Sequence, residues 1–230
     1  MNLSNFLFPI LFFFNSHFTP IPTDSNSPSL EEKSDTASEI YFSLNHPDGD
    51  LPSKEIFELA YAGWEKMDDK LNSPILTIVD FSLPSTERRL WIVDLTTKTV
   101  SLNTVVAHGR NSGELIASKF SNKPESYQSS LGFYKTGETY QGKHGYSLRL
   151  DGLEKGINDQ ARNRAIVIHG ADYANESFAK INGRLGRSLG CPALPAELSS
   201  KAIDLIKDGS LLFIYGNDAN YLSKSILSQP

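Results

Sequence analysis

The alternation of apolar and polar positions divides the chain into a helical stretch and a later series of short strands. In LPSKEIFELAYAGWEKMDDKL, residues 51–71, apolar side chains recur three and four positions apart, as they do on one face of a helix. Ser53 stands where an N-cap residue belongs. We therefore predict a helix that packs on the main domain through this apolar face.

From residue 75 onward the pattern is that of strands. Short runs rich in β-branched and aromatic residues are separated by Gly-rich and polar connections: ILTIVDFS, RRLWIVDL, TKTVSLNTVVAHG, GFYKTGETY, GYSLRLDGL and AIVIHG. PAELSSKAIDLIKDG then predicts a second helix, and SLLFIYG a last buried strand. The pattern predicts one mostly β domain of the β-rich α+β class, with an antiparallel or mixed sheet closed or folded on itself.

The segment before the first helix differs from the rest. The first 23 residues hold no Asp, Glu, Lys or Arg and six of the 13 phenylalanines, and the apolar run from Phe6 to Phe14 is too short to span a bilayer. We expect a signal peptide or apolar N-terminal segment at 1–22 and export to the periplasm or cell envelope, without a membrane span. The alternative is a misassigned start or a loosely packed apolar arm. Residues 23–39, rich in Ser, Pro and acids, predict a disordered linker. A helical segment at 40–74, the main domain at 75–218 and a tail at 219–230 complete the expected organisation.

Composition excludes several classes of function. Asp and Glu (27) outnumber Lys and Arg (22) and no basic run occurs, so we expect no nucleic-acid partner. The sequence holds no HExxH, no paired Cys/His spacing and no phosphate-binding loop, so we expect no metal and no cofactor. The chain has a single cysteine, which cannot form an internal disulfide. In an exported protein this points to a reactive thiol.

The flanks of Cys191 favour a nucleophile over an inert buried cysteine. Arg184, Arg187 and Ser188 make a polar, positive approach to it, and a predicted helix follows whose N-terminus helps to lower the thiol pKa. We expect the Gly190 and Cys191 N–H groups to be unpaired and to converge on an oxyanion site. His169 ends the run AIVIHG, which would place a basic imidazole at the C-terminal edge of a strand.

Together, IVIHGA and GRSLGCPAL resemble the signature of the L,D-transpeptidase (YkuD-type) catalytic domain, and more narrowly the murein L,D-transpeptidase catalytic domain family. In that signature a His-Gly pair precedes a Ser-x-Gly-Cys turn. The resemblance implies a YkuD-like β-sandwich or barrel-type domain. It implies Cys191 as nucleophile, His169 as base, the Gly170 carbonyl as the group that orients the imidazole, and Gly190 with Cys191 as the oxyanion hole.

The implied reaction is ping-pong acyl transfer on peptidoglycan stem peptides. Cys191 would attack the carbonyl of the third stem residue and release the terminal D-alanine, after which an amine of a second stem, or water, takes the acyl group. Arg187, Ser188 and His144 are the expected substrate-binding residues. Arg149 and Arg184 are further candidates for binding a carboxylate.

Leu189 departs from the family pattern, which usually has a second histidine there. His144 and His108 are the candidates to replace it in the cleft. The departure keeps two alternatives open: a hydrolytic L,D-carboxypeptidase acting on the same peptides, and an inactive exported wall-binding domain. Papain-like and NlpC-type peptidases place Cys before His, and sortases need an Arg after the Cys, so the order of residues here disfavours both classes.

Overall fold

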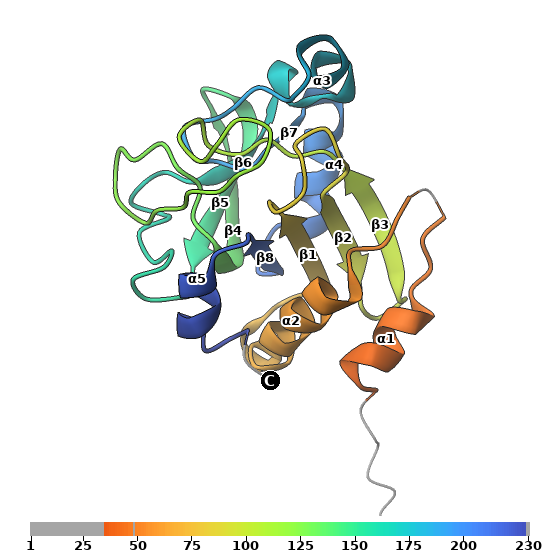
Figure 1. Cartoon of the computed structure of the whole chain (residues 1–230). Helices are drawn as coiled ribbons and strands as arrows, with labels where there is room; N and C mark the ends of the chain where they lie inside the picture. Colours follow the sequence, from red (N-terminus) through yellow and green to blue (C-terminus); the bar gives the residue numbers. More distant parts are fainter. Residues whose placement is uncertain (1–34, 48, 229–230) are drawn as a thin grey trace, which may run out of the picture. The chain divides into compact units, whose positions relative to one another are not determined.

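Strands of the described chain form one mixed sheet (Figure 1). The computed structural model describes residues 35–47 and 49–228, and the sheet order within them is β3-β2-β1-β8-β4-β5-β6-β7. The strands are β1 (Ile75–Asp80), β2 (Leu90–Asp94), β3 (Thr99–Thr104), β4 (Gly132–Gly142), β5 (Gly145–Gly152), β6 (Val167–Ala171), β7 (Ala193–Pro195) and β8 (Leu211–Tyr215). Two neighbouring pairs, β1·β8 and β6·β7, are parallel and the others antiparallel. The predicted mixed, mostly β fold is confirmed.

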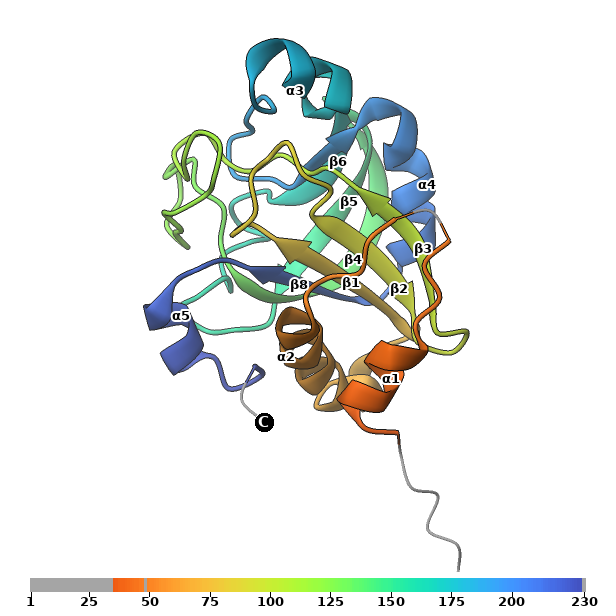
Figure 2. The same cartoon turned by 45° about the vertical axis from the view of Figure 1, so that its right-hand side comes forward.

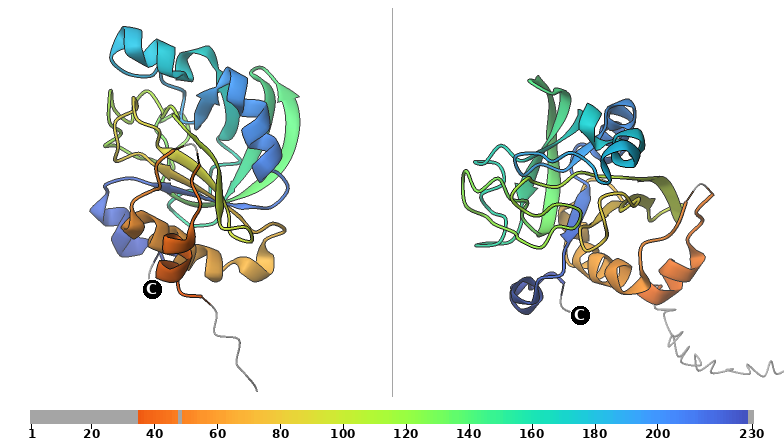
Figure 3. Two further views of the ribbon diagram at one scale, coloured as in Figure 1. Left: turned by 90° about the vertical axis from the view of Figure 1, so that its right-hand side faces the viewer. Right: turned by 45° about the horizontal axis from the view of Figure 1, so that its top comes forward.

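The sheet curves into a nearly closed barrel. β4 and β5 (green) bend strongly in Figure 3, and their register shifts between Thr136 and Thr139, an irregularity that increases local bending. The segment after β3 then reaches β7, because Ala107 N–H donates to Ala193 O at 2.8 Å and Ala193 N–H donates back to Ala107 O at 3.2 Å. This bridge brings β7, and with it the residues before β7, to the seam of the barrel.

The two predicted helices are present. α2 (Lys54–Glu65) begins after Ser53, whose hydroxyl accepts from Ile56 N–H as an N-cap does. It packs against β1 and β8, while α4 (Ala196–Ile206) packs against β6 (Figure 2). Only glycine fits at position 63 of α2, because a Cβ there would lie 2.2 Å from a ring carbon of Phe133. The close approach lets Phe133 stack on Phe213, with ring centroids 4.3 Å apart, in the centre of the sheet.

Three helices have no counterpart in the apolar pattern. They are α1 (Ala37–Ser43), which crosses the boundary between the expected linker at 23–39 and the expected helical segment at 40–74, α3 (Glu176–Asn182), and α5 (Ala219–Lys224), inside the expected tail. Each spans seven residues or fewer, too short to build an apolar period, and the sequence marks them only by their caps: Thr36 with Glu39, Asn175 and Asp218. The expected signal peptide lies outside the described residues. Within the described part of the chain, no helix is long and apolar enough to cross a membrane.

Candidate active site

His169 lies on β6, and Cys191 lies in the turn just before the neighbouring strand β7, at the barrel seam. β6 and β7 are parallel, His169 pairs with Ala193, and Cys191 stands two residues before that partner. Both side chains line one cavity of about 440 Å³. Its remaining lining residues are Tyr140, Lys143, His144, Arg164, Ala165, Ile166, Val167, Tyr173, Arg187, Ser188 and Leu189. The single thiol and the candidate base therefore face the same space.

His169 is held as a neutral imidazole. Its Nδ1 lies 3.0 Å from the carbonyl oxygen of Gly170, and because a carbonyl only accepts, Nδ1 carries the proton. Nε2 is then the unprotonated nitrogen. Burial lowers the pKa of His169, so the basic form persists at neutral pH. One expectation is wrong: His169 does not end its strand, because Gly170 and Ala171 continue β6 by pairing with β7.

The Cys191 thiol is half-buried. It donates to the Ala165 carbonyl, with Sγ 3.7 Å from the oxygen, rather than to His169. Burial raises the thiol pKa, while a hydrogen bond from the Val167 N–H, the charge of Arg164 and the N–H of Cys191 itself lower it. The rise prevails, so the resting thiol is protonated and needs a base to become a nucleophile.

The turn before Cys191 requires glycine. Gly190 has a φ of +128°, and a Cβ there would lie 2.9 Å from the Gln128 carbonyl oxygen. Ser129 further fixes the turn, because its hydroxyl donates to Gly190 O at 3.1 Å. Any other residue at position 190 would therefore strain the backbone or displace Gln128.

The expectation of an unpaired Gly190 N–H is wrong. This N–H donates to Ser188 Oγ at 3.0 Å, and the same hydroxyl donates to Cys191 O at 2.6 Å. Serine hydroxyls often form such local hydrogen bonds to nearby backbone groups, and here Ser188 satisfies both the Gly190 N–H and the Cys191 carbonyl. Ser188 therefore braces the Cys191 turn. Its role in binding substrate remains a prediction.

The two candidate replacement histidines have different environments. His144, in the turn between β4 and β5, stacks on His169 with ring centroids 4.3 Å apart and an interplanar angle of 23°. His108 is buried away from the cavity, with Nδ1 2.9 Å from Arg89 Nη2, and burial and the Arg89 charge lower its pKa to about 4. Leu189 is 58% exposed at the cavity rim. The structure brings His144, and not His108, to the candidate base.

The three arginines singled out in the sequence are already paired. Arg187 lines the cavity but binds Glu114 at 2.6 Å, and Arg184 binds the other oxygen of Glu114 at 3.1 Å. Arg149 pairs with Glu138 at 2.9 Å and does not line the cavity. Glu114 lies 73 residues before Arg187, and no sequence pattern joins the two. A substrate carboxylate would have to compete with Glu114 for Arg187.

Sequence reasoning missed four polar residues of the cavity wall. Tyr140, Lys143 and Tyr173 come from the end of β4, the following turn and the segment after β6, and Arg164 precedes β6 by three residues. Only the nearness of Arg164 to the IVIHG run pointed to it.

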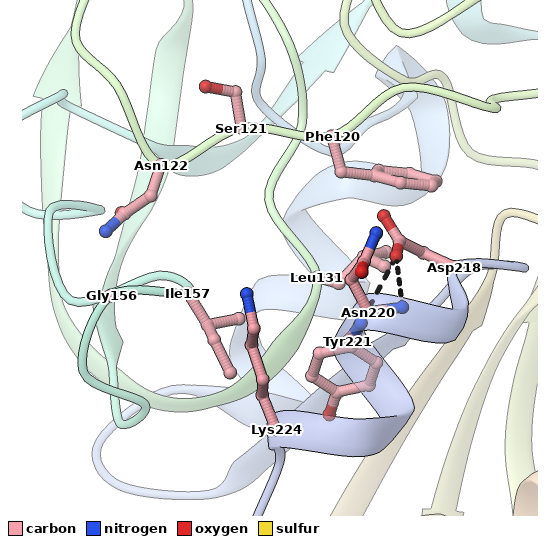
Figure 4. A pocket seen from close by; sticks show the side chains of 10 residues that line it. All are labelled: Phe120, Ser121, Asn122, Leu131, Gly156, Ile157, Asp218, Asn220, Tyr221 and Lys224. Atoms are coloured by element: carbon pink, nitrogen blue, oxygen red, sulfur yellow. Dashed lines mark hydrogen bonds between the residues drawn. The ribbon is translucent and has the colours of Figure 1, made fainter.

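A second pocket, of about 190 Å³, lies beside α5, and the Lys224 side chain extends from that helix toward Ile157 (Figure 4). No His or Cys lines it. Residues 35–47 and 49–228 contain no group of three side chains suited to a metal.

Among known proteins, the chain matches one family model over most of its length. The family model described as L,D-transpeptidase catalytic domain matches residues 50–215, which include α2 as well as the whole sheet. No curated protein matches the chain.

Several solved structures are similar at low identity. An L,D-transpeptidase from Mycobacterium smegmatis is 12% identical, with a TM-score of 0.39, over 62% of this chain and 59% of that one. An L,D-transpeptidase (Yku) from Stackebrandtia nassauensis is 17% identical, with a TM-score of 0.38, over 73% and 69%. The helical cell shape determining protein Pgp2 (K307A mutant) from Campylobacter jejuni is 13% identical, with a TM-score of 0.39, over 77% and 62%. The chain thus spans less than two thirds of the first and third of these proteins.

The family match covers most of the chain and all eight strands of the described sheet. By this match the chain belongs to the L,D-transpeptidase catalytic domain family.

Proposed function

We propose that the protein is a cysteine-dependent peptidoglycan L,D-transpeptidase that cross-links or remodels the cell wall. The observation that carries the proposal is the cavity shared by the only thiol, Cys191, and a neutral imidazole, His169. The His169 Nδ1 proton is committed to Gly170 O, so its Nε2 is available as a base. A thiol and a base in one half-open cavity are the minimum that nucleophilic acyl transfer requires.

The reaction has two half-steps. His169 Nε2 takes the Cys191 proton, and the thiolate attacks the carbonyl carbon of the third stem residue. Collapse of the tetrahedral intermediate breaks the peptide bond, and the imidazolium returns its proton to the departing D-alanine amine. His169 then deprotonates the incoming amine of a second stem as it attacks the thioester. Cys191 leaves as a thiolate, and the imidazolium returns the proton to it, which restores the resting thiol and the neutral His169. The Cys191 N–H, placed beside the sulfur, is the available oxyanion donor, and Gly190 N–H joins it if Ser188 Oγ yields.

Ser188, Arg187 and His144 are our proposed substrate-side residues. Ser188 and Arg187 lie on the Cys191 side of the cavity and His144 covers one face of His169. Because His144 stacks on the imidazole, it restricts ring rotation and so preserves the orientation of Nε2. The substrate lies in the cell envelope, so we propose that the protein is exported by the segment at 1–22 and acts there with catalysis carried by residues 75–218.

Leu189 is the residue on which we base the choice of acyl transfer over hydrolysis. Its side chain offers no hydrogen-bonding group at the cavity rim, where the family pattern has an imidazole. An apolar rim favours exclusion of water over its activation, which is the reason we place transfer before hydrolysis.

Purified protein incubated with disaccharide-tetrapeptides tests this function. We expect cross-linked dimers together with free D-alanine, separated by liquid chromatography and identified by mass. Disaccharide-tripeptide without dimers would replace the transferase by an L,D-carboxypeptidase. Unchanged substrate, with an acylation-competent thiol, would favour a wall-binding domain.

A further inference from the structure

Arg164 is fixed in the wall of the candidate active site. It precedes β6 and lines the cavity that contains Cys191 and His169. Four hydrogen bonds hold its guanidinium to the loop of residues 121–130: from Nη1 to Ser121 O (2.7 Å) and Ser130 Oγ (3.3 Å), and from Nη2 to Gln128 O (2.6 Å) and Ser126 Oγ (3.4 Å). All four acceptors are neutral, so the side chain is oriented without losing its charge.

No carboxylate neutralises this cation. Among the described residues no Asp or Glu forms an ion pair with Arg164, and the charged partners that influence its pKa are Tyr134 and Cys191. Tyr134 donates its hydroxyl proton to Ser130, and burial raises its pKa far above neutrality, so it supplies no negative charge. Arg187, on the same cavity, is by contrast paired with Glu114. A half-buried cation without a counter-ion is costly unless an anion forms beside it.

The guanidinium lies directly against the Cys191 turn. A Cβ placed on Gly190 would lie 3.4 Å from Arg164 Nη2 and 2.9 Å from Gln128 O, the atom that Nη2 holds. The same loop binds the turn a second time, because Ser129 donates to Gly190 O. The positive charge is thus held at the peptide that precedes the thiol.

We propose that Arg164 is a fixed cation that stabilises the Cys191 thiolate, and the oxyanion that follows from it, through space. It is a positioning residue, since the N–H groups of both Nη atoms are committed to the loop and its charge acts through Cys191. The thiolate half of the proposal stands independently, and the oxyanion half rests on the proposed function. The charge of Arg164 lowers the thiol pKa against the rise that burial imposes.

Other titratable groups line or border the same cavity and are held constant in the test. They are His169 on β6, His144 and Lys143 in the β4–β5 turn, Tyr140 on β4, Tyr173 after β6, and the Arg187–Glu114 pair before the Cys191 turn. Of these, His169 is the one whose protonation changes with that of the thiol in the proposed mechanism.

The experiment is the pH dependence of iodoacetamide alkylation of Cys191 in the full chain. Because Cys191 is the only thiol, the label reports on it alone. For Arg164→Gln and Arg164→Met we expect the midpoint to move upward, so that the rate at pH 7 falls about tenfold while rates above both midpoints converge. Arg164→Lys keeps the charge and loses the fork of hydrogen bonds, and we expect it to recover most of the rate.

Arg162→Gln is the matched control. Arg162 lies two residues away, is paired with Glu138 and Asp151, and does not line the cavity, so its loss should leave the midpoint unchanged. Two neutral variants are made so that the result rests on one that keeps the near-UV circular dichroism of the wild type. An unchanged midpoint in a folded neutral variant would overturn the proposal, as would an Arg164→Lys protein as slow as the neutral ones. Alkylation does not use peptidoglycan, so a failure here is distinguishable from a failure of the proposed function.

Discussion

Replacing Cys191 with Ala is expected to abolish acylation of the protein by a carbapenem. The drug presents a strained lactam carbonyl, and Cys191 is the only thiol in the chain that can open it. Wild-type protein should gain the mass of one carbapenem, and Cys191→Ala should gain none, as measured by intact-protein mass spectrometry. The expected loss is complete, because alanine provides no nucleophile.

The control for this result is Cys191→Ser, which keeps the shape of the side chain and its contact with Ala165. Serine is a much weaker nucleophile at neutral pH, so we expect a folded protein that forms little or no adduct. An adduct of unchanged yield on Cys191→Ala would remove the cysteine from the chemistry and assign acylation to another side chain.

The second large effect is expected for His169→Ala. Loss of the general base should lower peptide turnover by roughly 10²- to 10⁴-fold, and alkylation of Cys191 by iodoacetamide at neutral pH should slow. The wild type should lose activity as the pH falls through the His169 pKa, which burial holds below its usual value, because imidazolium cannot accept the thiol proton. His169→Ala should lack this acidic limb and be rescued only at alkaline pH.

His144→Ala is the matched comparison, since it removes the stacked ring but leaves the base and its hydrogen bond to Gly170. We expect a smaller loss of turnover than for His169→Ala. Alkylation rates of His169→Ala equal to those of the wild type across the pH range would exclude His169 as the base.

The regular elements of the fold could be predicted because their side chains repeat. Strands β1 and β8 are buried along almost their whole length, and their sequences are short runs dominated by apolar residues. The barrel seam could not be predicted, because it depends on Ala107 meeting Ala193 across 86 residues and on β7, a strand of only three residues. A three-residue strand and a bridge between two alanines are too short to produce a periodic pattern in the sequence.

The candidate site divides in the same way. Cys191 and His169 were identified from residue type and from their neighbours Gly190 and Gly170, which are local features of the sequence. The pairing of the polar groups could not be predicted from local sequence. Glu114, in a loop distant in sequence, forms an ion pair with Arg187, and Ser188 accepts a hydrogen bond from the Gly190 N–H that was expected to be free. Arg164 was missed because its neutral acceptors are spread over residues 121–130 and are recognisable only once the chain is folded.

The central claim, that Cys191 forms an acyl-enzyme with a stem peptide, is tested most directly by the intact mass of the protein mixed rapidly with a tetrapeptide stem. We predict a transient species heavier by the acyl-tripeptide, located on Cys191 by peptide mapping and absent from Cys191→Ala. Turnover of the tetrapeptide without any such species, or an adduct of the same mass on Cys191→Ala, would contradict the account.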